Sequence, residues 1–166
     1  MDVVQARFDV EGYDLVTAAV MVMVNTFPGL DFGESIEFAT EPADEGVAIF
    51  PTTGSFIYEE HESITGHVTQ MCQYPFTVVY RKSGLNSKRR ATAKEWLDQF
   101  ARWIERQPVT IDGTTYKLEA WPDLTKNRVI KDVSRQAPAY LTTVNDDKSE
   151  NWIMDVVVRY RNEFDR

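Results

Sequence analysis

The amino-acid sequence predicts an α+β fold, in which two principal helices pack on a mixed, mainly antiparallel sheet. Apolar residues alternate with others along residues 74–81 and 152–161, which is the period of two typical of strands. Residues 96–104 instead repeat apolar side chains at spacings of three and four, which is typical of one face of a helix. A chain of 166 residues can bury roughly 70 % of its unfolded surface in one core. We therefore expect a single domain over residues 1–166.

The first helix is predicted over residues 9–27 and would end at Phe27-Pro28-Gly29. Its apolar stripe consists of Leu15, Ala19, Val20, Met23 and Phe27. The β-branched valines within residues 20–24 also allow a strand there. The helix is favoured because a stripe that persists over about four turns is the longer pattern.

The middle of the chain predicts several strands and the second helix. Weak alternation over residues 35–41 and clearer alternation over residues 46–50 predict a short hairpin, followed by antiparallel strands at 55–62 and 67–82. A helix is predicted over residues 88–106, before Pro108, with a buried stripe of Trp96, Leu97, Phe100, Trp103 and Ile104. A tight hairpin should then join residues 109–111 to 114–118 across Asp112-Gly113.

The last third of the chain predicts one more pair of strands. Residues 139–144 and 152–161 form this pair, and the second of them should be central in the sheet. Residues 145–149 contain too many turn formers for a two-residue turn, which predicts a longer projecting loop. Residues 121–136 lack a sustained period and are predicted to be an extended, irregular connection.

Composition and charge argue against several classes of protein. A net charge of -8 opposes non-specific binding to DNA, because that affinity comes from neutralising phosphates. The longest apolar run, residues 15–27, is shorter than the ~20 residues of a membrane span, and no leader pattern opens the sequence. We expect a soluble, intracellular protein without a membrane partner.

The sequence shows no catalytic or metal-binding signature. The single cysteine, Cys72, lies in register with apolar strand residues and is predicted to be a core residue. His61 and His67 flank an acidic stretch, but on one strand they would lie about 20 Å apart. A solvated acidic edge is therefore favoured over a metal site. No nucleophile elbow and no phosphate-binding glycine loop occurs, so we expect neither enzyme activity nor a cofactor.

Two features could serve interactions. Lys88, Arg89 and Arg90 begin the second predicted helix, where positive charge opposes the helix dipole. The ordinary interpretation is a solvated turn, and the functional alternative is docking against the acidic face of a neighbouring copy. The aromatic side chains of Trp96, Phe100 and Trp103 could stack on bases, but their helical spacing favours a place in the core.

The order of these elements resembles the tail-terminator (tail-completion) proteins of long-tailed bacteriophages and prophages, some of which are labelled minor capsid proteins. The matching motifs are Asn25-Thr26-Phe27-Pro28-Gly29, Phe50-Pro51-Thr52-Thr53-Gly54, Tyr74-Pro75-Phe76-Thr77-Val78-Val79-Tyr80-Arg81, the long helix, and the Pro108 stop with its Asp112-Gly113 hairpin. The final strand pair matches too, so the resemblance covers nearly the whole chain. The long 121–136 connection and the acidic final loop depart from the family pattern.

The resemblance implies a structural virion protein at the head–tail junction, assembled in the cytoplasm of the host bacterium. Such proteins form a ring on the tail tube, usually a hexamer, stop tail polymerisation and join the tail to the head connector, while DNA passes through the lumen without specific binding. We expect contacts with a neighbour or partner at Lys88, Arg89, Arg90, Asp146, Asp147 and Lys148. A head–tail connector or adaptor is the main alternative. A small-molecule-binding protein or enzyme is a weaker one.

Overall fold

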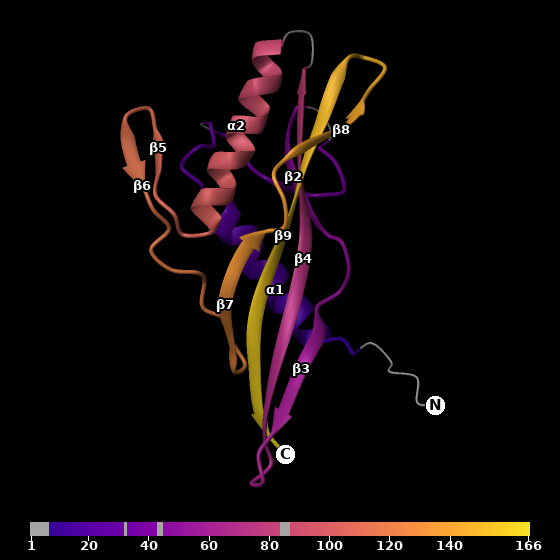
Figure 1. Ribbon diagram of the computed structural model, residues 1–166, viewed down its shortest axis with the longest axis vertical. Coiled ribbons are helices and arrows are strands. Elements are labelled where there is room, and N and C mark those ends of the chain that lie inside the picture. The colour runs from indigo at the N-terminus through magenta and orange to yellow at the C-terminus, as the bar shows by residue number, and fades with distance from the viewer. Residues whose placement is uncertain (1–6, 32, 43–44, 84–86) are drawn as a thin grey trace.

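The computed structural model describes residues 7–31, 33–42, 45–83 and 87–166, with backbone alone for residues 83 and 87–91. Within these residues the chain is mostly sheet with two helices (Figure 1). The elements follow the order α1 (Val10–Val24), β1 (Glu37–Phe38), β2 (Gly46–Pro51), β3 (Phe56–Glu62), β4 (His67–Ser83), α2 (Ser87–Ile104), β5 (Val109–Ile111), β6 (Thr114–Tyr116), β7 (Arg128–Arg135), β8 (Tyr140–Val144) and β9 (Ser149–Asp165).

Two long strands form the centre of the main sheet. β4 and β9 are each 17 residues long and pair antiparallel from His67 opposite Asp165 to Ser83 opposite Ser149. β2 and β3 both pair with the edge of β4 that faces away from β9, at different parts of its length. β7 and β8 both pair with the opposite edge of β9 in the same way. β1 adds to β2, and β5 pairs with β6 in a separate two-stranded sheet. The predicted central position of the last strand is confirmed.

Both helices cover the same face of this sheet. Residues directly paired across β4 and β9 share a face, and on this face they are buried and apolar. They include Tyr74, Phe76, Val78, Met154, Val156 and Val158. Phe27, just after α1, joins the two helices, because its ring lies 5.3 Å from those of Trp96, Phe100 and Trp103 in α2. The predicted core positions of Cys72 and of the α2 aromatic residues are confirmed, with Trp96 partly buried.

The helix predicted at the start of the chain is confirmed, and the strand alternative for residues 20–24 is wrong. α1 is capped by Asp9, whose side chain accepts a hydrogen bond from the Gly12 amide. Its buried stripe contains Val16, Val20, Met23 and Val24. Leu15 and Ala19, which the apolar pattern placed in this stripe, are only half-buried.

The hairpin predicted for residues 35–41 and 46–50 is wrong, because β1 runs parallel to β2. The connection between them therefore has to carry the chain back to the start of the neighbouring strand. Arg81 of β4 holds this connection: its Nη1 donates to the Pro42 carbonyl at 2.9 Å and its Nη2 lies 2.8 Å from Glu41. The sheet is mixed for this reason, and its other strand pairs are antiparallel.

β7 lies within the segment that was predicted to be irregular, so that prediction is wrong for residues 128–135. A β-bulge between Ile130 and Asp132 interrupts the pairing with β9. As a result Ile130 and Val133, three residues apart, are both buried, whereas Val129 and Lys131 are exposed. The bulge hides the period of two on which a strand prediction depends.

The conformation of Arg106, rather than the following Pro108, ends helix α2. Arg106 has a φ of 62°, the Arg106 amide donates to the Trp103 carbonyl, and the Gln107 amide donates to the Arg102 carbonyl. This is a Schellman motif, and it ends the helix at Ile104. The hairpin predicted beyond it is confirmed as β5 and β6.

Candidate interaction surface

The two segments predicted to make contacts lie at the same end of the sheet (Figure 1). Lys88, Arg89 and Arg90 belong to the start of α2, and their side chains fall outside the described residues. Asp146, Asp147 and Lys148 are exposed in the turn between β8 and β9. The ends of β4 and β9 carry the two segments, since Ser83 is paired with Ser149. The backbone thus brings both segments to one end of the molecule.

The β8–β9 connection has four residues, 145–148, so it is longer than a two-residue turn, as predicted, and its own hydrogen bonds make it compact. The Asn145 amide donates to the Ser149 carbonyl at 2.8 Å, and Lys148 has a φ of 70°. Asp147 Oδ1 accepts hydrogen bonds from the Ser149 hydroxyl at 2.6 Å and from the Ser149 amide at 3.0 Å. These bonds lower the pKa of Asp147. Asp147 therefore serves to close the turn, as aspartates commonly do.

A buried charged cluster ties the start of α1 to the sheet. Arg128 of β7 donates from Nη2 to Asp9 Oδ1 at 2.6 Å and from Nε to Asp9 Oδ2 at 2.9 Å. The Tyr160 hydroxyl donates to Asp9 Oδ2 at 2.7 Å, and Glu11 also contacts Arg128. Burial raises the pKa of Asp9, but the hydrogen bonds from Arg128, Tyr160 and Gly12 outweigh it, so the pKa lies below its usual value.

The bonds of this cluster indicate a structural role, in which it fixes the start of α1 to β7 and β9. Both Asp9 oxygens are occupied, and burial raises the pKa of Tyr160 and raises that of the nearby Cys72 thiol to about 11. Neither side chain is thus disposed to ionise near neutral pH. Sequence reasoning missed the cluster. An aspartate directly before an apolar helix is an N-cap signal, whereas nothing in the sequence marks Arg128 as its partner.

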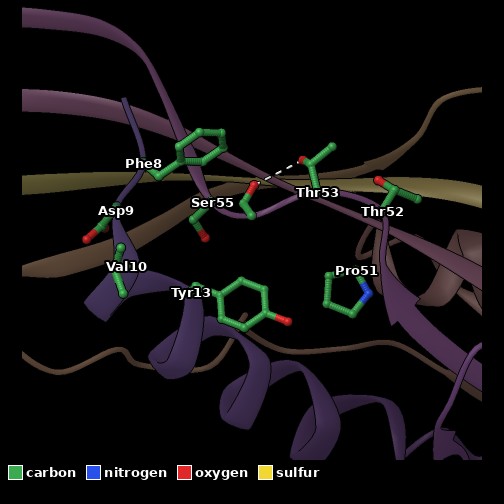
Figure 2. A pocket seen from close by; sticks show the side chains of 9 residues that line it. Phe8, Asp9, Val10, Tyr13, Pro51, Thr52, Thr53 and Ser55 are labelled. Atoms are coloured by element: carbon green, nitrogen blue, oxygen red, sulfur yellow. Dashed lines mark hydrogen bonds between the residues drawn. The ribbon is translucent and has the colours of Figure 1, made fainter. Parts of the chain in front are cut away.

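An open groove of about 590 Å³ lies between the start of α1 and the β2–β3 connection. Figure 2 shows Phe8 and Tyr13 beside it, with Pro51, Thr52 and Thr53 along the other side. Asp9 also borders the groove, but its carboxylate is held by Arg128 and Tyr160. The lining is mainly apolar, and among its polar groups the buried Ser55 hydroxyl has no hydrogen-bond partner within the described residues.

The two histidines lie on different strands, which differs from the single strand assumed for them. His61 is in β3 opposite Thr69, and a turn at residues 63–66 separates it from His67. His67 Nδ1 lies 2.8 Å from Asp165 and its Nε2 lies 3.9 Å from Glu163. The hydrogen bond with Asp165 raises the pKa of His67. Within the described part of the chain no three histidine, cysteine or acidic side chains group as a metal site would require.

β8 is an exposed edge strand without a charged residue. Its sequence is Tyr-Leu-Thr-Thr-Val, and all five residues are exposed. Within the residues that the structure describes, it pairs with β9 on one side alone. Free edges are usually protected by charges, because an added strand can pair with them. β8 therefore lacks the charge protection that is usual for an edge strand.

The β5–β6 hairpin lies on the opposite flank of the molecule from β8 (Figure 1). β5 packs on α2 through the buried Val109, whereas all three residues of β6 are exposed. Across this pair, the Thr110 and Thr115 hydroxyls form a hydrogen bond of 3.1 Å. A two-stranded ribbon is marginal by itself, so additional pairing would stabilise it.

α1 is unusually apolar on its outer side as well. No charged residue occurs between Asp14 and Asp31, and Val22 is 69 % exposed. A helix that is apolar on nearly all sides usually has a partner on more than one side.

Comparison with protein-family models and with curated proteins found no match to this chain. Among the described helices, none combines the length and the apolar character that crossing a membrane requires.

Proposed function

We propose that this protein is a structural subunit that assembles with copies of itself into a ring on the end of a bacteriophage tail tube. In this role it stops tube polymerisation and joins the tail to the head connector. The single observation that carries self-assembly is the pair of unprotected strands on opposite flanks, the uncharged β8 edge and the exposed β6. The place of assembly comes from the resemblance to tail terminators.

The arrangement of these flanks supports a ring. A contact between two different surfaces of the same subunit is heterologous, and such contacts form a closed ring when their rotation closes. The two flanks lie far apart in Figure 1, so each subunit can contact one neighbour on either side. Six copies, the order usual for the resembled family, would suit this arrangement.

The net charge of -8 supports a lumen through which DNA passes. Like charge between the ring and the phosphate backbone suppresses the contacts that would hold DNA in place. The same acidic character also suits a head–tail connector, which remains the second candidate for this reason.

The test is a phage or prophage lysate in which this gene is deleted, examined by electron microscopy. We expect overlong tails without heads, because polymerisation of the tube would continue unchecked. A plasmid copy of the gene should restore joined virions of normal tail length.

The other outcomes separate the alternatives. Tails of normal length that lack heads would assign the protein to the connector class. Joined virions of normal length would contradict the proposal for both classes.

A further inference from the structure

We infer that strand β6 of one copy adds to the free edge of β8 in the next copy, so that the main sheet continues from subunit to subunit. This inference rests on the proposed function, because it names the contact by which the ring would close. Strand addition obtains its affinity from main-chain hydrogen bonds, so it needs a free edge and a free strand. Both are present in each subunit.

β8 lacks the protection that several other edges of the described sheet have. The edge of β3 is covered where the Ile57 amide donates to the Arg7 carbonyl and the Asp9 amide donates to the Ser55 carbonyl. β3 also carries three glutamates and a histidine, and β7 carries four charged residues. β1 is only two residues long. Coverage and charge thus discourage pairing at β3, charge at β7 and shortness at β1, but none of these protects β8.

The length of β6 suits the edge that it would join. A bulge between Leu141 and Thr143 interrupts β8, so a regular added strand can extend over only a few residues. β6 has three residues, Thr114–Tyr116, and like β8 it is uncharged and rich in threonine. Tyr116 and Val144 are 39 % and 55 % exposed, and the pairing would cover apolar surface of both.

Charge indicates the direction of the added strand. In a parallel arrangement Lys117, directly after β6, lies near the turn that holds Asp146 and Asp147. In an antiparallel arrangement Asp112 lies there instead, which places like charges together. All four of these residues are exposed. The parallel arrangement is therefore favoured.

Chemical cross-linking tests the contact directly. The variants Thr143→Cys and Thr115→Cys each place a thiol on one of the two strands, and the native Cys72 is fully buried and so shielded from reagents. A short bismaleimide tolerates a one-residue difference in register. Mixing the two variants should yield covalent dimers, and the double variant should yield a ladder that ends at the ring order.

The single variants serve as matched controls, because a contact between different strands leaves each of them monomeric when it is treated alone. Dimers from Thr143→Cys alone would show that β8 pairs with another β8 and would overturn the inference. Absence of dimers from the mixture, at protein concentrations up to the solubility limit, would overturn it as well.

A second pair of variants tests the contact in the assembling virion. Val144→Lys places a charge at the end of β8, whereas Val129→Lys places the same charge on the edge of β7, at a valine of similar exposure. We expect Val144→Lys to weaken association about tenfold or more and to fail to complement the deletion. Val129→Lys should complement.

The two proposals fail in different ways. If the deletion yields overlong tails but Val144→Lys complements, the strand contact is wrong and the tail-terminator function stands. If the deletion leaves virions normal while the cross-linked ladder forms, the contact stands and the proposed function is wrong.

Discussion

At the scale of single residues, the strongest constraint is the carboxylate of Asp9. It caps α1 through the Gly12 amide, pairs with Arg128 of β7 and accepts a hydrogen bond from Tyr160 of β9. One side chain thus links a helix to two strands that lie more than a hundred residues later in the chain. Removal of one partner from a buried pair is costly, because the remaining charge loses its compensation.

The first prediction concerns the pH dependence of this link. Asp9→Asn should lower the free energy of unfolding by about 3 kcal/mol at neutral pH, because Arg128 loses its main partner. The folded pKa of Asp9 is depressed, so its contribution is present above the unfolded pKa of about 3.9 and is lost as pH falls through the folded value.

Urea denaturation at a series of pH values measures this effect. The difference in unfolding free energy between the native protein and the Asp9→Asn variant should be greatest near neutral pH and should shrink in acid. A difference that stays constant down to pH values well below the unfolded pKa would show that the charge of Asp9 plays no part.

At the scale of the elements, β4 and β9 organise the fold. Along β9, alternate residues face the helices or the opposite side, and Val156 is fully buried on the helix face beside Phe76 of β4. Asp155 belongs to the other parity, is partly exposed, and accepts a hydrogen bond from the Thr77 hydroxyl at 2.8 Å. The loss of stability caused by a substitution in β9 should therefore depend strongly on which face of the sheet the side chain lies on.

Val156→Asp should prevent folding, because it buries an unpaired carboxylate at a cost of several kcal/mol. Asp155→Asn should leave the melting temperature nearly unchanged, since the asparagine oxygen can still accept the hydrogen bond from the Thr77 hydroxyl. Thermal melting followed by circular dichroism distinguishes the two variants. A soluble Val156→Asp variant with a cooperative melt would mean that the core is misplaced.

At the scale of the whole molecule, the acidic charge and the open strands have separate consequences. In the proposed assembly the exposed β8 and β6 strands would favour contact between copies, whereas the net charge of -8 disfavours contact with nucleic acid. The proposed ring would need both properties, because its subunits must bind one another without retaining the DNA that passes through.

We therefore expect no retention of duplex DNA by the purified protein at about 0.15 M salt, where non-specific binding by basic proteins is still measurable. An electrophoretic mobility-shift assay over a range of protein concentrations provides the measurement, with a basic DNA-binding domain as the positive control. Retarded DNA at micromolar protein would contradict this expectation.

The sequence by itself determined those elements whose signal is local. Trp96, Leu97, Phe100, Trp103 and Ile104 identify α2 because a helix repeats its contacts every three to four residues. Asp112-Gly113 identifies the β5–β6 hairpin because a tight turn needs residues that tolerate positive φ, and both have it. The β4 and β9 strands were evident from their alternation, since one face of each is buried.

Only the tertiary structure decided the features that depend on distant partners. The bulge in β7 removes the alternation that would mark a strand, and its place in the sheet depends on β9. The parallel pairing of β1 depends on β2 and on the hold of Arg81, and the partnership of Asp9 with Arg128 spans most of the chain. The free edge of β8 likewise depends on which strands pair elsewhere in the sheet. Sequence patterns report the burial of a residue relative to its near neighbours, whereas pairing and open edges are properties of the assembled sheet.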